Sequence, residues 1–154
     1  GYSGSLEWNW NLYLQHYFHI LGSPRQEDWK QAEIMKDIAD DATRKGVPPN
    51  LALVPDLARF NSANFHLQAR LNGLRAKVDH LKRADLGIAS FEGFNYVLMT
   101  EGEQGMPWTT KASLALNQII VDEPRTFRIL KMYPLPNGDY VRLYYVSRDG
   151  SRVE

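Results

Sequence analysis

The side chains that could do chemistry in this chain lie just after two apolar segments. Residues 51–55 predict a buried strand, and Asp56 follows them directly. A second apolar segment is followed by Glu101. In open α/β sheets, ligands bind beyond the carboxyl ends of the strands. We therefore expect any ligand site at that edge of a sheet, and its candidate residues are Asp56, Asn61, Asn64 and Glu101.

Asp56 also has a structural interpretation. An aspartate after a strand is common in loops, and Pro55 before it favours a turn. Asn61 or Ser62 is expected to cap the helix that follows, which ends at Gly73. We expect Asp56 to shape or cap this corner of the fold, with ligand contact as the alternative.

Other kinds of site have little support in the sequence. Neither GxGxxG nor GxxxxGK[ST] occurs, so no phosphate-binding loop is predicted. No GxSxG or HExxH motif occurs, and the chain has no cysteine. The four histidines lack further ligands at zinc-binding spacing; they are His16, His19, His66 and His80. We therefore expect no catalytic residue, no metal site and no cofactor.

Composition places the chain among ordinary globular domains. Its 154 residues are enough for one domain with a core, and 44% of them are hydrophobic. Lysine plus arginine and aspartate plus glutamate both number 18, and the basic residues are scattered. Nucleic-acid binders need a basic excess or stripe, so no nucleic-acid partner is expected.

The first 22 residues form a separate aromatic segment. Within it, residues 8–21 place aromatic and leucine side chains at helical spacing. One interpretation is a helix packed on the core. The other is a segment at a membrane surface, where Trp and Tyr concentrate, and its interface residues would be Trp8, Trp10, Tyr13 and Tyr17. The remaining residues, 23–154, are expected to form a single α/β domain.

Three longer helices and five strands are predicted in this domain. Ser23 and Pro24 begin the first helix and Gly46 ends it. The second helix is expected to face the core through Ala63, Leu67 and Leu71. The third is expected to be capped by Thr109 or Thr110 and to face the core through Ala112, Ala115, Leu116 and Ile119.

The order of these elements predicts the fold class. Helices alternate with strands up to the third helix, and the last two strands, 126–133 and 140–147, flank an Asn137-Gly138 hairpin signal. Alternation of this kind favours parallel strands covered on both faces. We therefore expect an α/β fold with a three-layer, mostly parallel sheet flanked by helices, and a C-terminal antiparallel hairpin at the edge.

Four segments of the chain together resemble one protein family. They carry, in order, an Asp-Trp pair at a helix start, a Pro-Asp strand end before a Phe-Asn helix start, a Tyr-Val-Leu strand, and a Leu-Pro-Asn-Gly turn before an aromatic strand. The segments are residues 28–42, 51–74, 84–102 and 127–150. They are similar to the soluble C-terminal domain of bacterial membrane glycosyltransferases of the dolichyl-phosphate-mannose protein mannosyltransferase family.

This resemblance implies a function that composition and spacing alone do not indicate. Enzymes of the family transfer a sugar from a polyprenyl-phosphate donor on the outer side of a membrane, and their catalytic residues lie in loops of the membrane portion. The resemblance therefore implies a non-catalytic extracytoplasmic domain on the periplasmic side, anchored through the membrane portion of the same polypeptide. It would help to position the acceptor or the lipid-linked sugar. The alternatives are a stand-alone small-ligand domain, binding or enzymatic, and a protein-interaction domain.

Overall fold

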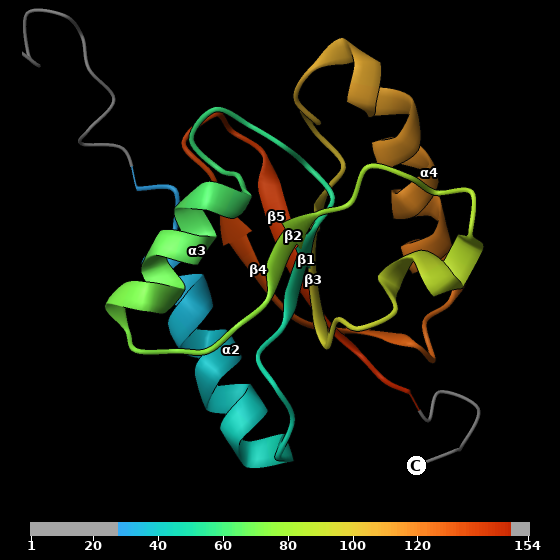
Figure 1. The fold of residues 1–154 in the computed structure, drawn as a ribbon. Coiled ribbons are helices and arrows are strands. Elements are labelled where there is room, and N and C mark those ends of the chain that lie inside the picture. The colour runs from blue at the N-terminus through green and yellow to red at the C-terminus, as the bar shows by residue number, and fades with distance from the viewer. Residues whose placement is uncertain (1–27, 149–154) are drawn as a thin grey trace, which may run out of the picture.

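A computed structural model describes residues 28–148, which form a five-stranded sheet with helices packed against it (Figure 1). The strand order across the sheet is β2-β1-β3-β5-β4. The strands are β1 (Leu51–Leu53), β2 (Val78–His80), β3 (Tyr96–Thr100), β4 (Phe127–Pro134) and β5 (Tyr140–Val146). The aromatic segment 1–22, interpreted either as a helix packed on the core or as a membrane-interface segment, lies outside the described residues, and so do its candidate interface residues Trp8, Trp10, Tyr13 and Tyr17.

The sheet is mixed. Strand β1 pairs in parallel with β2 and with β3, whereas β5 pairs antiparallel with both β3 and β4. The antiparallel pairs are the longer ones, so the expectation of a mostly parallel sheet is not confirmed. The α/β class is observed, and the β4–β5 hairpin lies at one edge as expected. Its turn uses Gly138 at φ 91°, a left-handed conformation that glycine adopts without strain.

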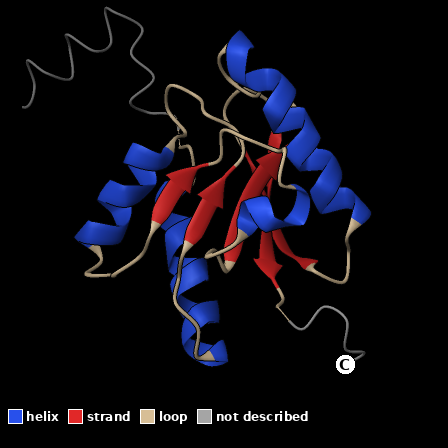
Figure 2. Ribbon diagram, turned by 45° about the vertical axis from the view of Figure 1, so that its right-hand side comes forward, coloured by secondary structure: helices blue, strands red, loops and turns tan. Residues whose placement is uncertain are grey.

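Helices lie on both faces of this sheet (Figures 1 and 2). One face packs against α2 (Gln31–Lys45) and α3 (Ser62–Leu71), and the other against η2 (Gly87–Phe91) and α4 (Pro107–Asp122). The strand side chains alternate between these two cores. Along β3, for example, Tyr96 and Leu98 belong to the α2 side, and Val97 and Met99 belong to the α4 side.

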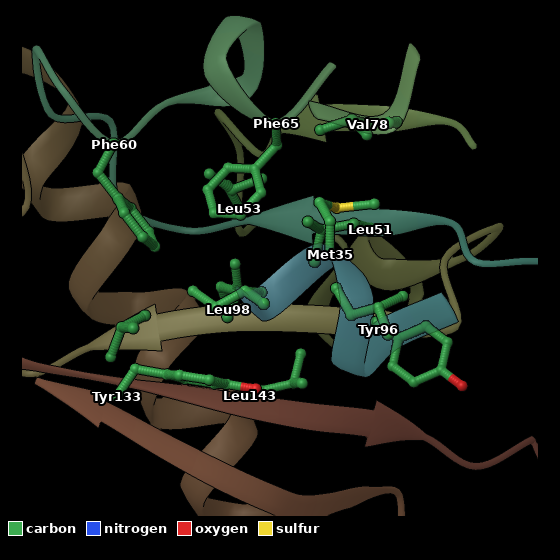
Figure 3. Packing of buried hydrophobic residues seen from close by; sticks show 14 of the residues in the cluster. Met35, Leu51, Leu53, Phe60, Phe65, Val78, Tyr96, Leu98, Tyr133 and Leu143 are labelled. Carbon is green, nitrogen blue, oxygen red and sulfur yellow. The ribbon is translucent and has the colours of Figure 1, made fainter. Parts of the chain in front are cut away.

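The core on the α2 side extends across the whole sheet (Figure 3). Met35 of α2 and Phe65 of α3 pack with residues of the strands, among them Leu98 of β3. The hairpin contributes Tyr133 and Leu143, each only 1% exposed. Helix α2 is therefore the element that covers the hairpin on this side.

Carboxylates of α2 tie that helix to the sheet. Asp37 accepts a hydrogen bond from the Tyr133 hydroxyl at 2.6 Å, and Lys131 Nζ lies 3.1 Å from the same carboxylate. One turn further along α2, Asp41 accepts a hydrogen bond of 2.7 Å from the buried Tyr96 hydroxyl. Because Asp37 and Asp41 are four residues apart, they point to the same side of the helix.

Asp41 is a buried carboxylate that remains charged. Burial raises its pKa, but hydrogen bonds from Lys45 and Tyr96, with the charges of Lys45 and Arg44, outweigh this effect and lower the pKa below 3.8. Burial, and then the hydrogen bond to the charged Asp41, raise the pKa of Tyr96. The pair is therefore an aspartate that accepts and a neutral tyrosine that donates.

The structure corrects the predicted inward faces of two helices. In α3, Phe65 and Ala69 are buried and Leu67 is 54% exposed. The prediction followed leucine spacing, but Phe65 packs edge-on against buried Phe60 at a centroid distance of 4.9 Å, and this contact sets the rotation of the helix. In α4 the predicted Leu116 is buried and Ile119 is partly buried, but Ala115 is exposed, and the other buried residues are Ser113, Asn117 and Ile120.

Helix α4 also begins earlier than predicted. Its N-cap is Met106, and Pro107 occupies the first helical turn, where its missing N–H costs nothing. Thr109 and Thr110 are inside the helix, and their hydroxyls donate to the Met106 carbonyl at 2.9 and 3.2 Å. The threonines therefore bond backwards along the helix instead of capping its first amides.

Candidate functional site

The edge of the sheet where ligands were expected is the carboxyl end of β1 and β3. The chain leaves β1 toward β2 on one side, while β3 lies on the other side, so the strand order reverses between them. Such switch points usually leave a crevice for a ligand. Asp56 follows β1 and Glu101 follows β3 directly, as the sequence predicted.

Asn61 and Asn64 form a capping box at the start of α3. The Asn61 Oδ1 accepts a hydrogen bond from the Asn64 amide at 3.1 Å, and the Asn64 Oδ1 accepts one from the Asn61 amide at 3.2 Å. The Asn61 side-chain amide also donates to the carbonyls of Leu57 and Ala58. This confirms the predicted cap at Asn61, and the side chain is fully engaged by the protein itself. Ligand contact by these two residues stays a prediction.

The loops that follow β1 and β3 touch each other through their backbones. The Asp56 amide donates to the Gln104 carbonyl at 2.9 Å, and Asp56 forms an isolated parallel bridge with Gly105. A Cβ on Gly105 would lie 2.1 Å from the Asp56 carbonyl oxygen, so only glycine fits. The corner at Asp56 is thus shaped by its backbone. Its half-buried carboxylate has no hydrogen-bond or ion-pair partner among residues 28–148.

Four side chains missed by the sequence-based prediction lie beneath this edge, and two of them meet at Val54. His80 Nε2 and Ser113 Oγ each lie 3.2 Å from the Val54 carbonyl oxygen. Ser113 is completely buried, and its hydroxyl donates to the Val54 carbonyl. Val54 follows the last residue of β1, so its carbonyl lies outside the paired part of the strand. His80 and Ser113 therefore both engage the backbone at the end of β1.

The other two side chains meet at Thr100. The side-chain amides of Gln104 and Asn117 donate to the Thr100 carbonyl at 2.6 and 2.8 Å. Both residues are buried, and their side-chain carbonyl oxygens have no partner in the described part of the chain. One sequence feature could have identified Asn117 as an inward residue. It lies four residues after Ser113 and one after Leu116, on the side of α4 that faces the sheet.

Glu101 lies at the mouth of a hollow of about 340 Å³. Its carboxylate accepts a hydrogen bond of 3.0 Å from Arg142 of β5, and the side chain of Glu101 is 65% exposed whereas that of Arg142 is 27% exposed. Partial burial lowers the pKa of Arg142, but the Tyr144 side chain and the Glu101 carboxylate outweigh this effect and raise it. The hollow is lined by Thr100, Glu101, Gly102, Met132, Gly138, Asp139, Tyr140 and Arg142.

This hollow presents both charged and uncharged polar groups. The Arg142–Glu101 pair offers one donor group and one acceptor group. Asp139, the other carboxylate in the hollow, accepts the Glu103 amide at 2.9 Å and so ties the hairpin turn to the loop after β3. Of the four predicted site residues, the structure therefore brings only Glu101 to this hollow, and Asp56, Asn61 and Asn64 do not line it.

Residues 28–148 contain no helix long and apolar enough to cross a membrane. Within the same residues, no three His, Asp or Glu side chains gather into a group that could hold a metal ion. No protein-family model, no curated protein and no solved structure matches this chain.

Proposed function

We propose that this chain is a non-catalytic extracytoplasmic domain of a polyprenyl-phosphate-sugar-dependent membrane glycosyltransferase, and that it helps to position the acceptor or the lipid-linked donor. The membrane portion of the same polypeptide would carry the catalytic residues and anchor the domain on the periplasmic side. The resemblance of the four sequence segments supports the assignment to this class of enzyme.

One structural observation supports a positioning role over a catalytic one. At the switch point of the sheet, where α/β enzymes usually keep their reactive groups, most polar side chains bond to the protein itself. Asn61 caps α3 and Asn117 bonds to a strand-end carbonyl, whereas the half-buried carboxylate of Asp56 is unpaired among residues 28–148. More accessible polar groups belong to the hollow at Glu101 and Arg142, which suits hydrogen bonding to a hydroxyl-rich molecule.

The experiment that tests this proposal begins with the reading frame around Gly1. The proposal expects several membrane spans encoded upstream of it. The chain itself should show no sugar transfer from a polyprenyl-phosphate-linked mannose to a protein acceptor, whereas the membrane portion should lose transfer when residues 28–148 are deleted from the parent. Transfer by the chain alone, or a parent without membrane spans, would contradict the proposal.

The alternative is a stand-alone domain for a small polar ligand, centred on the same hollow. It is favoured by the Arg142–Glu101 pair, which faces solvent at the end of β3. Under this alternative, free sugars should shift the backbone amide signals of Glu101 and Asp139 in NMR spectra. A parent with membrane spans and no such shifts would leave the glycosyltransferase domain as the better account.

A further inference from the structure

Helix α3 is apolar on two opposite sides. Its inner side is buried in the core through Phe65 and Ala69. Its other side carries apolar residues at intervals of four positions, which we call the outer stripe: Ala63, Leu67 and Leu71. We propose that residues 8–21 of the same chain form a helix that packs on the outer stripe. This inference does not depend on the proposed function.

The outer stripe is exposed, and residues 28–148 do not cover it. Leu67 is 54% exposed and Leu71 is 69% exposed. Leu67 lies two residues from Phe65 and from Ala69, so it points roughly 200° around the helix axis from either of them. A helix that is apolar on opposite sides is usually buried on both. The cover of the outer stripe is therefore expected from outside the described residues.

The chain enters the described structure beside the start of α3. The side-chain amide of Gln31 donates to the Arg59 carbonyl, two residues before Asn61, the N-cap of α3. In Figure 1 the first described residues, drawn in blue, run beside this end of the helix. Residues 22–27 span at most about 20 Å when fully extended. The segment 8–21 is therefore held within reach of the outer stripe by its own connection.

The sequence of residues 8–21 suits an apolar protein surface. Its aromatic and leucine side chains recur at helical spacing, at Trp10, Tyr13, Leu14, Tyr17, Phe18 and Leu21. The segment contains no aspartate, glutamate, lysine or arginine. Helices that lie on a membrane surface usually carry lysine and arginine on their polar side. The lack of these residues favours packing on the protein over packing on lipid.

The covalent connection favours this segment over a second copy of the chain. A short linker holds a segment near its binding surface at an effective concentration on the order of millimolar. A second copy reaches that concentration only in very concentrated solution. The outer stripe is therefore occupied from within the chain before another molecule can compete for it.

The connection also sets the direction of packing. A helix over residues 8–21 would be about 21 Å long and α3 is about 15 Å long. Because the linker begins at the end of the segment and leads to the start of α3, the two helices are antiparallel. This direction brings Glu7 to the end of α3 that carries Arg70. Arg70 is exposed and has no ion-pair partner among residues 28–148, so the charges at this end are complementary.

The first test uses single cysteines, because the chain has none of its own. In the full chain, Leu67→Cys should react with a maleimide about tenfold or more slowly than Leu114→Cys, since the segment must detach first. The control position is matched, because Leu114 is 51% exposed but lies on α4. Adding Leu14→Asp and Phe18→Asp should raise the rate at position 67 to that of the control, because buried charges oppose packing.

Two further measurements make the outcome of this test specific. The control cysteine should keep its rate when the two aspartates are added, which shows that the domain stays folded. The protection at position 67 should be the same from about 1 to 200 μM protein, a range that would reveal a micromolar dimer. Equal rates at the two cysteines, or protection that the aspartates leave in place, overturn the proposal.

The same measurements identify the other occupants of the outer stripe. Protection that appears only at high protein concentration would assign the stripe to a second copy. Protection that appears only with vesicles of phosphatidylcholine and phosphatidylglycerol would assign it to a membrane. Either result overturns the proposal.

The second test measures the direction of packing. Trp10→Cys is combined with Leu71→Cys in one variant and with Ala63→Cys in another, and both are treated with a short bismaleimide. Ala63 and Leu71 lie on the same stripe, about 12 Å apart along the helix axis. The pair with Leu71→Cys should form the intramolecular cross-link about fivefold faster or more, because its thiols are closer. Equal rates, or faster cross-linking to position 63, contradict the antiparallel arrangement.

Discussion

The two faces of the β4–β5 hairpin share the same backbone, yet they are packed to different extents. We call the side turned to α2 the covered face and the side turned to α4 the open face. On the covered face, Tyr133 and Leu143 are almost completely buried, and Lys131 bonds to carboxylates of α2. On the open face, side chains near α4 are buried, but Ile129 and Met132 are about half exposed. Both faces are rich in apolar residues, so the difference lies in how far the covering helix reaches across each one.

The largest difference between the faces should appear on truncating an apolar side chain on each. Leu143→Ala leaves a cavity in a closed core and should lower the free energy of unfolding by about 2–5 kcal/mol. Met132→Ala on the open face should cost less than about 1 kcal/mol, because water already reaches that side chain. Urea unfolding of both variants measures the comparison. Equal losses would mean that the two faces are packed alike.

The next largest effect concerns Asp41, a carboxylate of α2 that bonds to the sheet. Asp41→Asn removes the charged acceptor of Tyr96 and Lys45, and should lower the free energy of unfolding by about 1–3 kcal/mol at pH 7. Because the pKa of Asp41 is lowered in the folded state, its contribution is present above the ordinary value of 3.8 and is lost as pH falls through the lower folded value.

The gap in stability between Asp41→Asn and the unmodified chain should therefore shrink as the pH falls below 3.8, where this carboxylate becomes protonated first in the unfolded and then in the folded chain. Chemical unfolding at several pH values in this range measures it. Asp40→Asn is the matched control, since Asp40 lies next in sequence and forms only an exposed pair with Lys36. A gap that stays constant through this range would show that the charge of Asp41 contributes nothing.

A smaller effect is expected from removing one hydroxyl of the covered face. Tyr133→Phe loses the hydrogen bond to Asp37 and leaves the ring packing in place, so the free energy of unfolding should fall by about 0.5–1.5 kcal/mol. Tyr140→Phe removes an exposed hydroxyl from the same hairpin and should change nothing measurable. Thermal unfolding followed by circular dichroism compares the two. Indistinguishable midpoints would argue against the Tyr133–Asp37 bond.

The smallest effect belongs to the open face of the isolated monomer. Ile129→Thr keeps a β-branched side chain and should change the free energy of unfolding by less than about 0.5 kcal/mol in dilute protein. The measurement is urea unfolding of the variant beside the unmodified chain. A loss of more than about 1 kcal/mol would show that Ile129 is packed in the folded chain.

Much of the secondary structure could be predicted from local signals, because each signal acts within a few residues. Gly46 ends α2 in a left-handed conformation, and Asn61 caps α3. The Asn137-Gly138 turn joins β4 to β5. The sheet order could not be predicted in this way, since nothing local states that β5 pairs with β3 while β4 takes the edge.

The candidate site was less predictable than the fold, and for a physical reason. Asp56 and Glu101 were placed correctly after their strands, but their environments depend on residues distant in sequence. Glu101 meets Arg142, 41 residues later, only because β5 pairs with β3. Ser113 was overlooked because a buried serine resembles an exposed one in any pattern of apolar spacing, until the strand-end carbonyl that it bonds is known.

The contact between Gly105 and Asp56 has a consequence for how this fold could acquire new chemistry. The two loops meet where α/β enzymes hold substrates. They lie so close that a side chain on Gly105 would overlap the Asp56 carbonyl oxygen. Any larger residue at position 105 would force the loops apart, expose the unpaired carboxylate of Asp56 and free the amides and carbonyls that now bond to each other. A single substitution at Gly105 would therefore be enough to open this corner of the fold, and it would lower the free energy of unfolding.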